Sequence, residues 1–183
     1  MIGLPPLCLV LRFAAALGLL LAAGAARAQP TEEEVKAAFL PKFARYVVWP
    51  RAMQPGGHAP FQLCVIGSDP FGRMLDRAAA GESIDGRGVA VRRLASAAGA
   101  AGCHLAFVQG AAPGETGRLL LALRGQPVLT VTDDRAGPQR GMIHFTIVGG
   151  RVRFFIDEAS AAARGLSISS RLLALAAGVR PRR

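Results

Sequence analysis

The sequence predicts an α/β fold of three layers, in which a mostly parallel sheet is flanked by helices and ends in an antiparallel hairpin. Short apolar segments alternate with helical patterns from residue 61 to residue 132, which is typical of βαβ units. Two further strand-like segments are then joined by Gly149-Gly150, a pair that favours a two-residue hairpin turn. The chain of 183 residues is long enough for one domain with a substantial core.

An apolar segment near the N-terminus predicts export. Phe13 to Ala26 follows Arg12 and leads into the small-x-small sequence Ala26-Arg27-Ala28, which is typical of a cleavage site. The segment has about 14 residues, whereas about 20 are needed to span a bilayer. We therefore expect residues 1–28 to be a cleavable signal peptide, with an uncleaved anchor as the alternative. Residues 29–183 would then form a single exported domain.

The charge pattern argues against nucleic-acid binding. The formal net charge is +10, and most of it comes from arginines that are scattered from Arg45 to Arg183. Aromatic residues make up only 6 % of the chain and do not alternate with basic clusters, as they often do where nucleic acid is bound. We therefore expect a partner other than nucleic acid.

The cysteines predict one disulfide bond. Cys8 would leave with the signal peptide, so Cys64 and Cys103 would be the pair that remains. In an oxidising compartment an even pair favours a disulfide, here closing a loop of about 40 residues. Two buried thiols are the alternative.

The first helix is expected to begin after Thr31 and to end at Trp49-Pro50. Thr31 and Glu34 have the spacing of a capping box, and three glutamates suit the helix N-terminus. Apolar residues recur from Val35 to Val47 at helical spacing. Pro41 interrupts this pattern and should kink the helix or remove a hydrogen bond.

The middle of the chain should supply the parallel sheet. The expected strands are Phe61–Gly67, Val89–Leu94, Cys103–Gln109 and Pro127–Thr132. The helices between them are expected from Pro70 to Ala78 and from Thr116 to Arg124, with a polar loop over Gly81–Gly88 and a helix or loop over Ala95–Gly102.

The C-terminal third should begin with the hairpin and end with two helices. The hairpin strands are Met142–Val148 and Arg151–Ile156. A helix is expected over Glu158–Arg164, followed by a last helix over Arg171–Ala177 with Gly178 as its C-terminal stop.

Motifs of familiar enzymes are missing from the sequence. It contains no P-loop, H-E-x-x-H, G-x-S-x-G or C-x-x-C, so we expect no enzyme and no cofactor. His104 follows Cys103 on a strand, which puts the two side chains on opposite faces and argues against a zinc site. The turn around Asp69 follows a strand and opens a helix, where α/β proteins bind anions, so Asp69 is a candidate ligand residue.

Five segments together resemble the YfiR family of periplasmic proteins. They occur in the same order and at similar spacing, and they cover nearly all of the exported region. The segments are Val35–Pro50, Leu63–Gly72, Cys103-His104, Val128–Asp133, and Gly141–Ile143 with Arg153–Ile156 and Gly165–Leu173.

This resemblance implies a periplasmic negative regulator. Such a protein would bind the periplasmic domain of an inner-membrane diguanylate cyclase, or of another membrane sensor, and keep cyclic-di-GMP and biofilm formation low. Arg171 in the C-terminal motif and Arg45 on the first helix are the candidate partner residues. A small-molecule sensor without direct repression is the alternative, with a crevice near Gly67–Phe71 and Asp133 as its site. A homodimer is left open.

Overall fold

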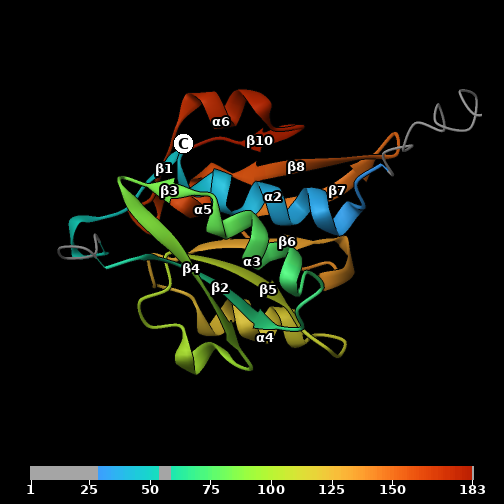
Figure 1. Ribbon diagram of the computed structural model, residues 1–183, viewed down its shortest axis with the longest axis horizontal. Coiled ribbons are helices and arrows are strands. Elements are labelled where there is room, and N and C mark those ends of the chain that lie inside the picture. The colour runs from blue at the N-terminus through green and yellow to red at the C-terminus, as the bar shows by residue number, and fades with distance from the viewer. Residues whose placement is uncertain (1–28, 54–58, 183) are drawn as a thin grey trace, which may run out of the picture. The chain divides into compact units, whose positions relative to one another are not determined.

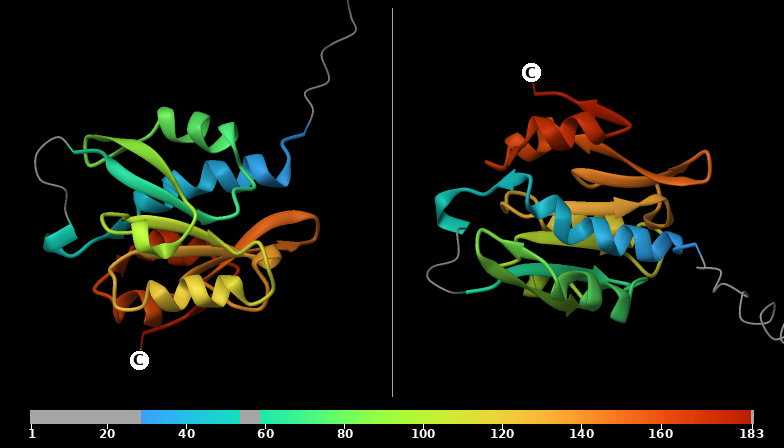
Figure 2. Two further views of the ribbon diagram at one scale, coloured as in Figure 1. Left: turned by 90° about the horizontal axis from the view of Figure 1, so that it is seen from below. Right: turned by 45° about the horizontal axis from the view of Figure 1, so that its top comes forward.

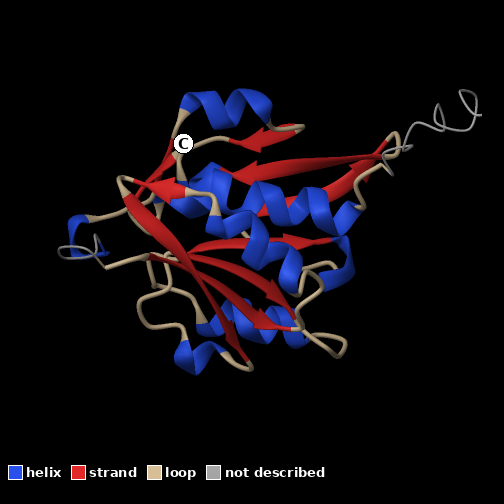
Figure 3. Cartoon of the chain, in the orientation of Figure 1, coloured by secondary structure: helices blue, strands red, loops and turns tan. Residues whose placement is uncertain are grey.

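A computed structural model of the chain describes residues 29–53 and 59–182 (Figure 1). The expected signal peptide lies outside these residues. Residues 31–183 form one compact unit, in which helices and an eight-stranded, mostly parallel sheet are combined (Figure 3). Within the described residues, no helix is both long and apolar enough to cross a membrane.

The centre of the sheet is parallel, as predicted. Its neighbouring strands are β4 (Arg87–Leu94), β2 (Phe61–Gly67), β5 (Leu105–Gln109), β6 (Leu129–Asp133) and β7 (Ile143–Val148), in that spatial order. Each of these four pairings is parallel. The carboxyl ends of the five strands therefore lie at the same edge of the sheet.

The two margins of the sheet are more elaborate than the sequence suggested. β8 (Arg151–Asp157) pairs with β7 as the expected antiparallel hairpin, through the turn at Gly149-Gly150. The hairpin is not the end of the sheet, because β10 (Gly178–Arg180) adds in parallel to β8. At the other margin β3 (Ser83–Ile84) pairs antiparallel with β4, where only a polar loop was expected.

Alternating residues of β2 supply two separate apolar clusters. Leu63 and Val65 belong to the larger cluster, which contains side chains of α2 (Glu32–Ala44) and α3 (Arg73–Ala80). Cys64 and Ile66 belong to the smaller one, with side chains of α4 (Glu115–Ala122) and the 3-10 helix η2 (Ala97–Gly99). Figures 1 and 2 show α4 on the opposite side of the strands from α2 and α3. The expected three layers are confirmed in part.

The first helix has the expected start and an unexpected end. The Thr31 hydroxyl accepts a hydrogen bond from Glu34 N–H, and the Glu34 carboxylate accepts one from Thr31 N–H, so the predicted capping box is present. Pro41 is buried inside the helix. The helix ends at Ala44, and Val47–Val48 forms the short strand β1 instead of a last helical turn. The predicted extension to Trp49 is therefore wrong.

The C-terminal segment also differs from the prediction. It contains α5 (Glu158–Ala162), β9 (Ser167–Ile168) and α6 (Ser170–Leu175). Gly178 begins β10 instead of stopping a helix, because Ala177 N donates to Phe154 O and the chain continues along β8. A Cβ at position 178 would lie 2.9 Å from the Phe155 ring, so glycine permits this close approach.

Candidate functional site

Two motifs that are far apart in the sequence meet in a small antiparallel sheet. β1 pairs with β9, and the partners are Val47 with Ile168 and Val48 with Ser167. The pairing continues at Ser169, whose N–H donates to the Tyr46 carbonyl at 2.8 Å. The end of the first helix and the C-terminal motif thus form one structural feature.

A glycine fixes the approach of these two segments. Gly165 has a positive φ of 73°, which favours glycine, and a Cβ there would lie 3.0 Å from Cγ of Pro50. The chain therefore turns closely over Pro50 before it enters β9. Ile168 and Val47, which are partners in this pairing, are both buried.

The outer side of the small sheet is exposed and carries little charge of its own. Val48 is 63 % exposed, the highest value among the large hydrophobic residues with described burial. Its strand partner Ser167 is also exposed. Arg45 and Arg171 are the exposed arginines that flank the pair in the sequence. We call these four residues the β1–β9 surface.

The two arginines of this surface are held differently. Arg45 directly follows α2, and its Nη1 lies 3.4 Å from the Glu82 carboxylate, with 58 % of its side chain exposed. Arg171 lies in the first turn of α6, where its N–H donates to the Ser169 hydroxyl. The Arg171 guanidinium forms no ion pair with a described carboxylate.

A cavity of about 230 Å³ adjoins this surface. Arg45 lines it, and Arg171 does not. Its apolar wall includes Trp49, whose Nε1–H donates to the His104 carbonyl at 3.0 Å. Asp85 and Arg87 also line the cavity, and they form an ion pair with each other at 3.7 Å.

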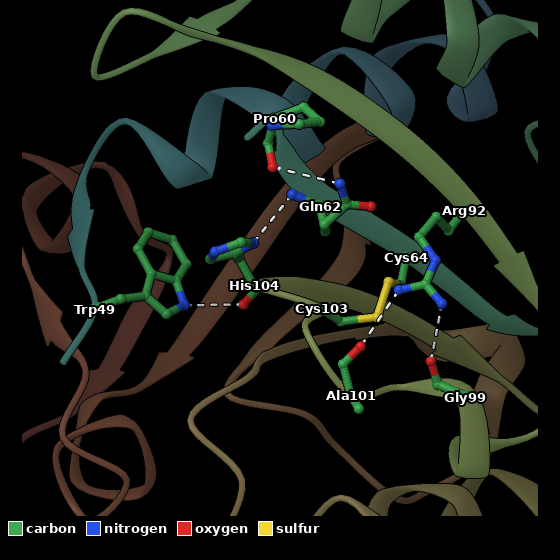
Figure 4. The surroundings of a disulfide bond; sticks show 9 residues. All are labelled: Trp49, Pro60, Gln62, Cys64, Arg92, Gly99, Ala101, Cys103 and His104. Atoms are coloured by element: carbon green, nitrogen blue, oxygen red, sulfur yellow. Dashed lines mark hydrogen bonds between the residues drawn. A yellow bond between two sulfur atoms is a disulfide. The ribbon is translucent and has the colours of Figure 1, made fainter. Parts of the chain in front are cut away.

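His104 is a structural histidine at the base of this cavity. Its Nδ1 accepts a hydrogen bond from Gln62 N (Figure 4). Its Nε2 therefore carries the proton and donates to the Met53 carbonyl. Burial is the main cause that lowers the pKa of His104, and the ring is neutral at pH 7. Among the described residues, no three His, Cys, Asp or Glu side chains gather as metal ligands.

The structure joins the two predicted cysteines in a disulfide. Cys64 lies on β2 and Cys103 just before β5, with their Cα atoms 5.9 Å apart. Both residues are fully buried beside η2. Arg92 covers the bond by donating to the carbonyls of Gly99 and Ala101 (Figure 4).

Asp69 is engaged in holding its own turn. One carboxylate oxygen accepts the N–H groups of Phe71 and Gly72, at 2.8 and 3.1 Å. The other lies 2.7 Å from Nε of Arg93, whose guanidinium also binds Asp76. The Arg93 hydrogen bond is the largest cause that lowers the pKa of Asp76. The sequence located this turn correctly, but the polar atoms of Asp69 face the protein.

The chain's own carboxylates likewise occupy the ends of the next strands. Glu115 accepts the N–H groups of Ala111 and Ala112 after β5, where an anion would otherwise be favoured. Asp133 accepts the N–H of Arg135 after β6. These contacts use the backbone donors that the predicted crevice would have offered to a ligand.

Asp133 also forms an ion pair that the sequence did not reveal. Lys36 Nζ lies 2.7 Å from Asp133 Oδ2, and the two side chains are only 3 % and 1 % exposed. In the sequence, 97 positions separate Lys36 from its partner. Only the packing of α2 over the sheet brings them together.

A buried histidine lies next to this pair. Thr132 Oγ1 accepts from Gly141 N and donates to His144 Nδ1, so His144 Nε2 donates to Asp134 at 3.0 Å. Burial lowers the pKa of His144, and the ring is neutral at pH 7. Each polar group of this network has a partner inside the protein, which is typical of a structural role.

The family comparison agrees with the arrangement of these motifs. Residues 33–177 match the model of the DUF4154 family, which is described as YfiR/HmsC-like. No curated protein matches the chain. The matched region runs from the first turn of α2 to beyond the end of α6, and it includes the residues of the β1–β9 surface and both cysteines of the disulfide. The chain therefore belongs to the YfiR/HmsC-like family.

Proposed function

We propose that this chain is a periplasmic regulator that represses a membrane-bound signalling partner. The partner proposed is an inner-membrane diguanylate cyclase, whose periplasmic domain the exported residues 29–183 would bind. Repression would lower cytoplasmic cyclic-di-GMP and biofilm formation. Membership of the YfiR/HmsC-like family supports a regulatory rather than a catalytic role.

One observation carries the choice of binding surface. The pairing of β1 with β9 brings the exposed Val48 beside Ser167. Arg45 precedes Val48 in the chain, and Arg171 follows Ser167. Protein interfaces are rich in arginine and in apolar side chains at their centre. Val48 would be the apolar contact, and the two arginines would bind carboxylates of the partner.

Repression would work by differential affinity. The protein must bind the inactive state of the cyclase more tightly than the active state, since a ligand with equal affinity for both shifts nothing. A preference of about 100-fold would supply about 2.7 kcal/mol of coupling free energy. The signal then passes through a partner that crosses the membrane.

A periplasmic small-molecule sensor is the second candidate. The cavity of about 230 Å³ beside the β1–β9 surface favours this alternative, because it combines aromatic walls with charged residues. A ligand there would lie against Arg45, so ligand binding and partner binding would be coupled. The two functions are compatible in one protein.

The proposal is tested by deleting the gene and measuring cyclic-di-GMP in the cells. We expect the level to rise and to be restored by the full chain, but not by residues 29–183 without their export segment. An unchanged level after deletion would overturn the proposed repression.

A further inference from the structure

A second cavity, separate from the one beside β1 and β9, is lined by three arginines and no carboxylate. It has a volume of about 280 Å³ and lies between α4, the segment before β7, and α5. The arginines are Arg124, Arg140 and Arg164. Ser160 and Gln139 add further polar groups to the lining.

Arg164 is the unusual member of this group. Its Nη1 is buried and has no hydrogen-bond partner in the described part of the chain. Burial, followed by the charge of Arg124, lowers the pKa of Arg164. A buried guanidinium donor without an acceptor costs free energy, and a second cation nearby adds to this cost.

Among the described residues that line this cavity there is no carboxylate, and Asp134 acts on Arg140 only through a charge interaction from outside the lining. The carboxylates of α5 and its N-cap are engaged elsewhere, because Asp157 pairs with Arg180 and Glu158 pairs with Arg182. Within the described residues, none of Arg124, Arg140 and Arg164 forms an ion pair. Arg140 stacks over the Phe155 ring at 5.8 Å, which leaves its N–H groups able to bind an oxygen ligand.

We propose that the cavity lined by Arg124, Arg140 and Arg164 is a binding site for a small oxyanion, either a phosphate or a carboxylate. Guanidinium groups bind both through paired N–H···O bonds, so the shared chemistry is a planar or tetrahedral group of anionic oxygens. The volume is just below the usual range for ligand sites and suits a small anion rather than a large cofactor. The Gln139 amide would provide an additional donor, whereas the Ser160 hydroxyl already donates to Asp157 at 2.8 Å.

The site does not depend on the repressor function. It shares no lining residue with the cavity beside the β1–β9 surface. An anion bound there would connect the end of α4 with the end of α5, which precedes Gly165 and β9.

The test is a titration of the exported protein with inorganic phosphate and, separately, with succinate, in chloride buffers of matched ionic strength. Calorimetry should show saturable binding of at least one anion. At 100 times its Kd that anion should raise Tm by about 5–10 °C. Binding of phosphate alone or of succinate alone would support the site and identify its ligand class.

Substitutions then locate the binding. Arg164→Gln and Arg124→Gln should each raise the Kd of the anion about tenfold or more. Arg164→Lys should also raise the Kd, because the forked guanidinium donor is lost. Arg118→Gln removes an equal charge from the exposed side of α4 and should leave the Kd unchanged. Without anion, Arg164→Gln should be at least as stable as the wild type.

Three results would overturn the proposal. The first is that neither phosphate nor succinate gives saturable binding or a higher Tm than chloride does at the same ionic strength. The second is binding that Arg164→Gln and Arg124→Gln weaken no more than Arg118→Gln does. The third is binding of an acidic peptide but of neither small anion, which would assign the arginines to a protein partner.

Discussion

Lys36 on α2 and Asp133 at the end of β6 form a buried ion pair, with Nζ 2.7 Å from Oδ2. This contact ties the first helix to the carboxyl edge of the central sheet. It also occupies a carboxylate that could otherwise have faced a ligand. The helix that leads into β1 is therefore anchored from within.

Removing the lysine should destabilise the fold strongly. Lys36→Met leaves the Asp133 carboxylate buried without a counter-ion, which typically costs about 3–5 kcal/mol. Urea unfolding measures this loss. Lys42→Met is the matched control on the same helix, because Lys42 is exposed and should change stability by less than about 0.5 kcal/mol.

A double variant measures the interaction energy between Lys36 and Asp133 apart from their other contacts. Lys36→Met with Asp133→Asn should lose less stability than the sum of the two single variants, because neither charge is left alone. Strict additivity of the two losses would contradict the ion pair.

The disulfide should be complete in exported protein and important for stability. Denatured protein should show no free thiol from Cys64 or Cys103 until reductant is added. Reduction should then lower the free energy of unfolding by about 2–5 kcal/mol, because the unfolded chain gains freedom. Two free thiols in protein exported to the periplasm would contradict the disulfide between Cys64 and Cys103.

Stability should fall on mild acidification because of the two buried histidines. Burial lowers the pKa of His104 and His144 below the value of about 6.5 for the unfolded chain. The unfolded state therefore binds more protons, and stability is fully present above about pH 6.5 and declines as the pH falls below it. His104→Gln should make the slope shallower between pH 7 and pH 5.5, and an unchanged slope would contradict the assignment.

Asp69 should act on stability through its turn. Asp69→Ala removes the acceptor for two N–H groups and the partner of Arg93, and should cost about 1–2 kcal/mol in thermal or urea unfolding. Asp69→Asn can retain the backbone contacts and lose only the partly exposed ion pair, so its cost should be smaller. Equal losses in the two variants would show that the charge of Asp69, and not its hydrogen bonds within the turn, dominates.

The sequence predicted the regular elements better than the connections between distant segments. Phe61–Gly67 is a short, continuous apolar run of the kind that forms a buried strand, and the strand bounds agree there. The Thr31 capping box was also visible, because its donors and acceptors are three residues apart. Local patterns of this kind depend little on the rest of the fold.

The candidate site was harder to predict because it depends on pairing across the chain. Val47–Val48 is too short to show a strand period, and it becomes a strand only because Ser167–Ile168 lies beside it. The sequence indicated Arg45 and Arg171 through separate motifs without placing those motifs together. The sequence did not indicate a role for Arg164, because the missing acceptor for its Nη1 can be seen only in the folded structure.

The most direct test of the proposed repression is binding of purified residues 29–183 to the periplasmic domain of an inner-membrane diguanylate cyclase from the same organism. Val48→Asp should weaken that binding at least about tenfold, because a charge in the apolar centre of the interface must be desolvated. Val148→Asp is the matched control, since Val148 is 52 % exposed at the end of the β7–β8 hairpin. The account predicts that the wild type and Val148→Asp bind equally and Val48→Asp does not. Equal binding by all three proteins, or no binding by the wild type, would contradict it.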